Sequence, residues 1–172
     1  MHETPTTSSS EIEAAPRIGL GTDRHRMVVG RPCLLGGVSI DCQVGPFGHS
    51  DADAILHALI DALLGAAGLD DIGTLFPDTD PQWKGANSAD LLVEALQLLS
   101  AQSLHPVSAD ITAHCDRPKI GPHRAQIRAN LANWLGLPLD RVNIKGKTLE
   151  GVTTDVEYID VIAVVLLQNH RD

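Results

Sequence analysis

Two short clusters of aspartate and histidine could bind a metal ion. The first holds Asp23 and His25, two positions apart in a segment that reads as a strand. Residues two apart in a strand point the same way, so both side chains can approach one ion. The second holds Asp53, His57 and Asp61, which recur at helical spacing on one face. Two imidazoles and one carboxylate with an open position are a common catalytic zinc site. We therefore expect Asp23, His25 and His57 to bind zinc, with Asp61 orienting His57.

Each feature also has a purely structural interpretation. An Asp-x-His pair is frequent by chance. His57 lies among leucines and could be a hydrogen-bonded core histidine, while Asp53 and Asp61 could belong to a solvated helix face. Spacing alone leaves both interpretations open.

The composition limits the class of protein. A chain of 172 residues is a single-domain length, and only 3% aromatic residues require an aliphatic core. The net charge of −9 argues against a nucleic-acid partner, which would need clustered lysine and arginine. Three cysteines without metal-binding spacing favour a reducing compartment, and no signal sequence or membrane span is apparent. We expect a cytoplasmic location.

The elements that must position these clusters alternate between strands and helices. We expect a disordered tail over residues 1–16 and one domain over residues 17–172. The domain should be α/β (α+β), with a mixed β-sheet covered by helices on one face. Apolar spacing predicts strands at 17–23 (turning at Gly21), 107–115, 142–145 and 159–167, and a hairpin at 33–40. It predicts helices at 53–67, 89–102 and 122–135, with Ser50, Asp51 and Ser88 as caps and a loop over 73–88.

Longer motifs carry a resemblance to a known family. The string GTDRH at 21–25 is similar to the opening motif of the cyclodiphosphate synthases of the non-mevalonate isoprenoid pathway. Residues 49–88, HSDADAILHALIDALLGAAGLDDIGTLFPDTDPQWKGANS, resemble that family's most distinctive block. DRPKIGPH at 116–123 and VNIKGKTLE at 142–150 resemble two later segments. Together these motifs cover residues 18–167 in order.

The resemblance implies a reaction. Such enzymes convert 4-diphosphocytidyl-2-C-methyl-D-erythritol 2-phosphate to 2-C-methyl-D-erythritol 2,4-cyclodiphosphate and release CMP. The substrate's own 2-phosphate attacks the β-phosphorus, so the protein mainly positions groups and stabilises charge. The family is a homotrimer with sites between subunits.

The resemblance also implies roles for individual residues. His49 and Thr148 would stabilise the transition state, and Asp23, His25 and His57 would bind zinc. Glu150 would bind a second ion, Mg²⁺ or Mn²⁺, which favours oxygen ligands. The substrate contacts would come from five segments: Asp23, Arg24 and His25; His49 and Ser50; Asp71, Ile72, Gly73, Phe76, Pro77, Asp78, Thr79 and Asp80; Cys115, Asp116, Arg117, Pro118, Lys119, Ile120 and Gly121, for the cytidine; and Lys147, Thr148, Leu149 and Glu150.

Two positions depart from the family pattern. Lys147 puts a cation where a hydroxyl is usual, and Asp155 stands where an arginine is usual. Replacing an arginine by an aspartate reverses a phosphate-binding charge, so we expect weak binding of a prenyl diphosphate at the trimer axis. The departures leave open a non-catalytic trimeric metal-binding paralogue as an alternative to an active enzyme. A further alternative is a generic zinc phosphohydrolase that uses water as the nucleophile.

Overall fold

The computed structural model describes residues 15–48, 50–83, 86–152 and 155–169. Its main sheet has five strands in the order β4-β1-β7-β5-β6. Strands β5 and β6 are parallel and the other neighbours antiparallel, so the sheet is mixed, as expected. A separate hairpin joins β2 to β3. The strands are β1 (Arg17–Val29), β2 (Cys33–Leu35), β3 (Val38–Ile40), β4 (Val44–Pro46), β5 (Leu104–His114), β6 (Val142–Lys147) and β7 (Tyr158–Asn169).

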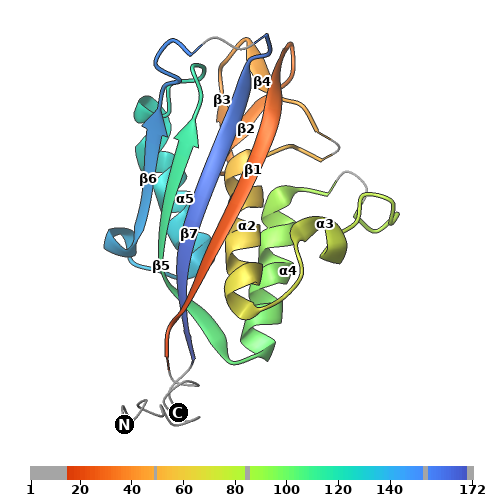
Figure 1. The fold of residues 1–172 in the computed structure, drawn as a ribbon, viewed down its shortest axis with the longest axis vertical. Helices are drawn as coiled ribbons and strands as arrows, with labels where there is room; N and C mark the ends of the chain where they lie inside the picture. The colour runs from red at the N-terminus through yellow and green to blue at the C-terminus, as the bar shows by residue number, and fades with distance from the viewer. Residues whose placement is uncertain (1–14, 49, 84–85, 153–154, 170–172) are drawn as a thin grey trace, which may run out of the picture.

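The main helices cover one face of this sheet (Figure 1). They are α2 (Ala54–Ala67), α4 (Ser88–Ala101) and α5 (Arg124–Leu135), with a short α3 (Ile72–Leu75) and single turns at η1 (Gly121–His123) and η2 (Leu139–Arg141). Helix α2 packs on β1 and β7 and α5 on β6, around an almost wholly aliphatic core. This confirms the predicted fold class. Among the described residues, no helix combines the length and apolar character needed to cross a membrane.

The opposite sheet face carries exposed apolar side chains. Ile18 and Leu20 on β1 are 73% and 63% exposed, and Ile162 and Val164 on β7 are 36% and 40% exposed. The register aligns Leu20 with Val164 and Thr22 with Ile162, so these side chains form one patch. No described element of this chain covers it.

Four local predictions were wrong at element ends. Strand β1 continues through Gly21 to Val29, because it pairs with β7 from Arg17 to Arg26 and then with β4. Helix α2 is capped by Asp53 rather than Ser50 or Asp51, and α4 is capped by Asn87, which makes Ser88 its first residue. The expected loop over 73–88 contains the last residues of the short helix α3.

The Asp53 carboxylate fixes the start of α2. It is fully buried, and it accepts hydrogen bonds from the N–H groups of Ile55 and Leu56 at the helix N-terminus. It also accepts from the N–H groups of Gly36 and Gly37, at 2.8 and 2.7 Å. These two glycines have positive φ angles in the turn between β2 and β3. One side chain therefore ties the hairpin to the helix that carries His57.

Two glycines of β1 let α2 approach closely. A Cβ atom at Gly21 would lie 2.1 Å from the carbonyl oxygen of Ala58, and one at Gly19 would lie 1.8 Å from that of Ala62. No side chain fits at such distances, because the obstructing atoms belong to the helix backbone. The close packing keeps the strand that carries Asp23 and His25 next to the helix that carries His57.

We predict that Gly21→Ala lowers the free energy of unfolding by at least about 2 kcal/mol, because strand and helix must separate. Gly65→Ala is the matched control in α2, since its Cβ atom would have only the Leu20 carbonyl oxygen nearby, at 4.0 Å. Removing a helical glycine there should leave stability unchanged or raise it by up to about 1 kcal/mol. Urea denaturation measures both, and equal stabilities for the two variants would contradict the packing argument.

Candidate metal centre

Three potential ligand atoms converge between β1 and α2. Oδ2 of Asp23 lies 2.8 Å from Nε2 of His25 and 3.2 Å from Nδ1 of His57. The two ring nitrogens lie 3.3 Å apart. Alternation along β1 places Asp23 and His25 on the helix side of the sheet, and α2 brings in His57. The sequence clusters are therefore adjacent in space.

The spacing of these atoms fits one tetrahedral ion. Ligands about 2.0–2.1 Å from a tetrahedral zinc ion lie roughly 3.3 Å from one another. The observed separations of 2.8, 3.2 and 3.3 Å are close to this value. Among the described residues, Asp23, His25 and His57 form the one group of three or more such side chains arranged closely enough to hold a metal ion.

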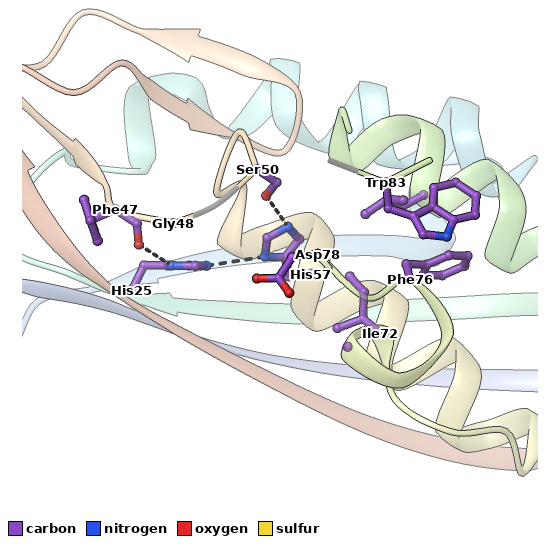
Figure 2. A pocket seen from close by; sticks show the side chains of 11 residues that line it. His25, Phe47, Gly48, Ser50, His57, Ile72, Phe76, Asp78 and Trp83 are labelled. Atoms are coloured by element: carbon purple, nitrogen blue, oxygen red, sulfur yellow. Dashed lines mark hydrogen bonds between the residues drawn. The ribbon is translucent and has the colours of Figure 1, made fainter. Parts of the chain in front are cut away.

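Each histidine also has a partner for its other ring nitrogen. Nδ1 of His25 lies 2.8 Å from the carbonyl oxygen of Phe47 (Figure 2). Nε2 of His57 lies 2.8 Å from Oγ of Ser88 and 3.4 Å from Oγ of Ser50. Histidines that bind metal typically donate their second N–H to such a partner, which fixes the tautomer. Nδ1 of His25 and Nε2 of His57 therefore point outward to these partners, which leaves Nε2 of His25 and Nδ1 of His57 free to bind a cation.

Asp23 and His25 shift each other's pKa. Burial would raise the pKa of Asp23, but hydrogen bonds with His25 and His57 outweigh it and lower the pKa to about 2. Burial would lower the pKa of His25, but the hydrogen bond and charge of Asp23 outweigh that effect and raise it. Without a metal ion, the anionic carboxylate therefore favours a protonated His25.

A cavity of about 600 Å³ opens beside these ligands (Figure 2). His25, Ser50 and His57 line the end at the candidate metal centre. Phe76 and Trp83 lie edge to face in its wall, with ring centroids 5.1 Å apart. The other lining residues are Phe47, Gly48, Ile72, Gly73, Asp78 and Leu91. Five residues expected to contact substrate, apart from the histidines, therefore line one cavity: Ser50, Ile72, Gly73, Phe76 and Asp78.

A second cavity, of about 250 Å³, lies at the β6 side of the sheet. The residues expected to bind cytidine supply Cys115, Lys119, Ile120 and Gly121 to its lining, and the segment after them supplies Pro122. Gly146, Lys147 and Thr148 from β6 and its end complete it. Nearby, Arg117 donates two hydrogen bonds to Glu157, at 2.9 and 2.6 Å, and Asp116 accepts one from the Leu149 N–H. The hydrogen bond between Asp116 and Leu149 thus joins two of the segments expected to contact substrate, residues 115–121 and 147–150.

Several expected site residues lie elsewhere. Arg24 points to the uncovered sheet face, where its guanidinium pairs with Asp160 at 3.0 Å. Asp71 is the cap of α3 and accepts a hydrogen bond from the Thr74 N–H. The exposed Glu150 accepts a hydrogen bond from the Thr148 hydroxyl. Glu150 is not part of the three-ligand cluster of the described residues. His49 lies outside the described residues.

The expected partner of His57 also differs. The Asp61 carboxylate accepts a hydrogen bond from the Ile72 N–H, at 2.8 Å, and so holds the start of α3. The outward nitrogen of His57 instead lies closest to Ser88, at the start of α4. Helical spacing brought Asp61 to the right face, but the direction of the imidazole decides which group it contacts.

Sequence reasoning missed three contributors to this site. Phe47 offers a backbone carbonyl, which its residue type does not reveal. Trp83 joins the cavity through its packing on Phe76. Ser88 was identified only as a helix cap. The proximity of Ser88 to His57, 31 positions apart in the chain, required the packing of α4 on α2.

Comparison with known proteins identifies the family. Residues 16–168 match the model of the YgbB family. The chain is 53% identical over 152 residues to 2-C-methyl-D-erythritol 2,4-cyclodiphosphate synthase of Symbiobacterium thermophilum, covering 87% of this chain and 97% of the relative. It is 54% identical over 136 residues to the synthase of Bordetella avium, covering 79% of this chain and 84% of the relative.

Solved structures give the same result. A 2-C-methyl-D-erythritol 2,4-cyclodiphosphate synthase in a CDP-bound form superposes with a TM-score of 0.84 at 47% identity, covering 88% of this chain and all of that one. A CDP complex of the Plasmodium falciparum protein IspF gives 0.79 at 35% identity, covering 92% and 99%. Both the sequence and the fold match over nearly the whole described domain. The chain therefore belongs to the YgbB family and is similar over most of its length to 2-C-methyl-D-erythritol 2,4-cyclodiphosphate synthases.

Proposed function

We propose that this chain converts 4-diphosphocytidyl-2-C-methyl-D-erythritol 2-phosphate to 2-C-methyl-D-erythritol 2,4-cyclodiphosphate and CMP. The observation that carries the proposal is the convergence of Asp23, His25 and His57 at one end of a cavity. The chain shares about half its residues with synthases of this name. The enzyme would act in non-mevalonate isoprenoid synthesis.

The reaction is an internal phosphoryl transfer. An oxygen of the substrate's 2-phosphate forms a bond to the β-phosphorus, and the bond from that phosphorus to the bridging oxygen of the α-phosphate breaks. The electron pair stays with CMP, which leaves, and no protein nucleophile is consumed. The task of the protein is to align the 2-phosphate with the β-phosphorus and to offset the negative charges.

The residues of this chain divide that task. Zinc bound by Asp23, His25 and His57 would act as a Lewis acid toward a phosphoryl oxygen. The Ser50 hydroxyl lies in the cavity wall and would donate a hydrogen bond to the same phosphate. Phe76 and Ile72 line the cavity and would contact the methylerythritol carbons. His49 and Thr148 would stabilise the transition state, and Glu150 would bind Mg²⁺ or Mn²⁺ near the α-phosphate.

We propose that the complete site forms between subunits of a homotrimer. β1 carries two metal ligands, whereas β6 contributes to the expected cytidine cavity, and β7 and β5 lie between them. Three strand spacings amount to roughly 14 Å. The exposed apolar patch of Ile18, Leu20, Ile162 and Val164 favours burial against further copies. A neighbouring copy would then bring its nucleotide cavity to the metal centre.

One observation favours a second candidate, a non-catalytic metal-binding paralogue. Lys147 lines the expected cytidine cavity, at a position where the family usually has a hydroxyl. Its ammonium group could pair with the α-phosphate or obstruct the nucleotide.

The three free cysteines of the described chain agree with the cytoplasmic location that we propose.

Incubation with the cytidylyl substrate, Zn²⁺ and Mg²⁺ should yield CMP and the cyclic diphosphate. His57→Ala should lower turnover by more than about 100-fold, since removing a ligand costs more than the roughly 10–100-fold of losing an outer partner. His105→Gln is the control, because His105 lies near the start of β5, at the end away from the metal centre. It should turn over substrate as the wild type does. Phosphorus NMR and mass spectrometry identify the products. Unchanged substrate would favour the paralogue, and a linear product would indicate a phosphohydrolase.

Zinc affinity should fall as the pH drops through the pKa of His25. A proton and the metal compete for Nε2 of His25, and Asp23 raises the pKa of this histidine above the ordinary 6.5. Below that pKa the affinity should fall by at least about tenfold per pH unit. Chelator competition between about pH 8 and about pH 5.5 spans this range. A constant affinity over this interval would contradict the proposed ligand set.

A further inference from the structure

The two ring nitrogens of His57 face different surroundings. Nδ1 lies 3.2 Å from the Asp23 carboxylate and 3.3 Å from Nε2 of His25. Nε2 points the other way, 2.8 Å from Oγ of Ser88. A neutral imidazole carries one proton, so if Nδ1 binds a cation, Nε2 must be the protonated nitrogen. In that state Nε2–H donates to the Ser88 hydroxyl.

The Ser88 hydroxyl can accept the hydrogen bond from His57 because its own proton is donated to Asp51. Ser88 is fully buried, and its Oγ–H donates to Oδ1 of Asp51. The Ser88 backbone N–H donates to the other oxygen of Asp51, at 3.0 Å. With its proton directed at a carboxylate, the hydroxyl oxygen is left as an acceptor toward His57. The hydrogen bonds therefore run in one direction, from His57 through Ser88 to Asp51.

No neighbouring group takes the place of Ser88 in this series of hydrogen bonds. Oγ of Ser50 also approaches Nε2 of His57, but at 3.4 Å, and it accepts a hydrogen bond from the Ala52 N–H. Asp61 accepts from the Ile72 N–H instead. Asp51 is itself held by the Asp53 N–H, at 3.2 Å. Ser88 is thus the nearest acceptor for the outward proton of His57.

We propose that Ser88 and Asp51 are positioning residues of the metal centre. They hold His57 in the tautomer that presents Nδ1 to the cation, and Asp51 makes the imidazole a stronger ligand through the intervening hydroxyl. This inference rests on the proposed metal centre. It also assigns a role to the start of α4, where Ser88 is the first residue.

Ser88→Ala tests the proposal, because it removes the acceptor without adding volume. Zinc affinity, measured by chelator competition, should fall by about 10–100-fold, the usual effect of losing an outer partner of a metal ligand. Ser100→Ala is the matched control, an exposed serine on the same helix. It should bind zinc as the wild type does. Nitrogen NMR of the histidine rings provides a second measurement. In metal-free protein, neutral His57 should be protonated at Nε2 in the wild type, and a larger fraction should be protonated at Nδ1, next to Asp23, in Ser88→Ala.

Asp51→Asn tests the chain of hydrogen bonds from its other end, because it removes the charge but keeps the shape. It should weaken zinc binding in the same direction, and it replaces the first test if Ser88→Ala does not fold. Affinities within twofold of Ser100→Ala for the folded variants would overturn the proposal while leaving the metal centre intact. A wild-type chain that takes up no zinc would overturn the metal centre and this inference with it.

Discussion

The close approach of β1 and α2 is the constraint on which the site depends. Three ligand atoms from two elements lie within 3.3 Å of one another, so small shifts of either backbone would separate them. Gly19 and Gly21 permit the approach because they have no Cβ atom. A Cβ atom at either position would collide with a carbonyl group of α2. The same glycines alternate with the exposed Ile18 and Leu20, so one strand both packs on the helix and presents the uncovered face.

A second layer of hydrogen bonds determines which atoms face the metal position. The Phe47 carbonyl oxygen contacts the outward nitrogen of His25, and Ser88 contacts that of His57. Asp53 holds the N-terminus of α2 against the β2–β3 turn, which fixes the helix that carries His57. The candidate metal centre is thus supported by the segment after β4, by the N-terminus of α4 and by the β2–β3 hairpin. The start of α4 is distant in sequence from the other two segments, and folding brings it beside them.

Sequence reasoning predicted the elements better than their contacts. The mixed sheet, the helices on one face, the hairpin and the Asp23–His25–His57 cluster followed from periodicity, motif spacing and resemblance, and the structure confirms them. Element ends were less certain, since Gly21 reads as a turn residue but lies within β1 to admit a helix. The partner of His57 depended on the direction of one ring, which spacing cannot supply. Ser88 could be recognised only after α4 was placed beside α2.

The cavity at the metal centre lies beside β1, and the cavity lined by the expected cytidine-binding residues lies beside β6, with β7 and β5 between them. The metal centre remains the element that every proposed role requires. Anomalous diffraction at the zinc edge, from crystals of zinc-loaded protein, tests it most directly. We expect one peak per chain at about 2.0–2.2 Å from Oδ2 of Asp23, Nε2 of His25 and Nδ1 of His57, with a further position open to the cavity. A zinc peak at other side chains, or coordination through Nε2 of His57, would contradict the account.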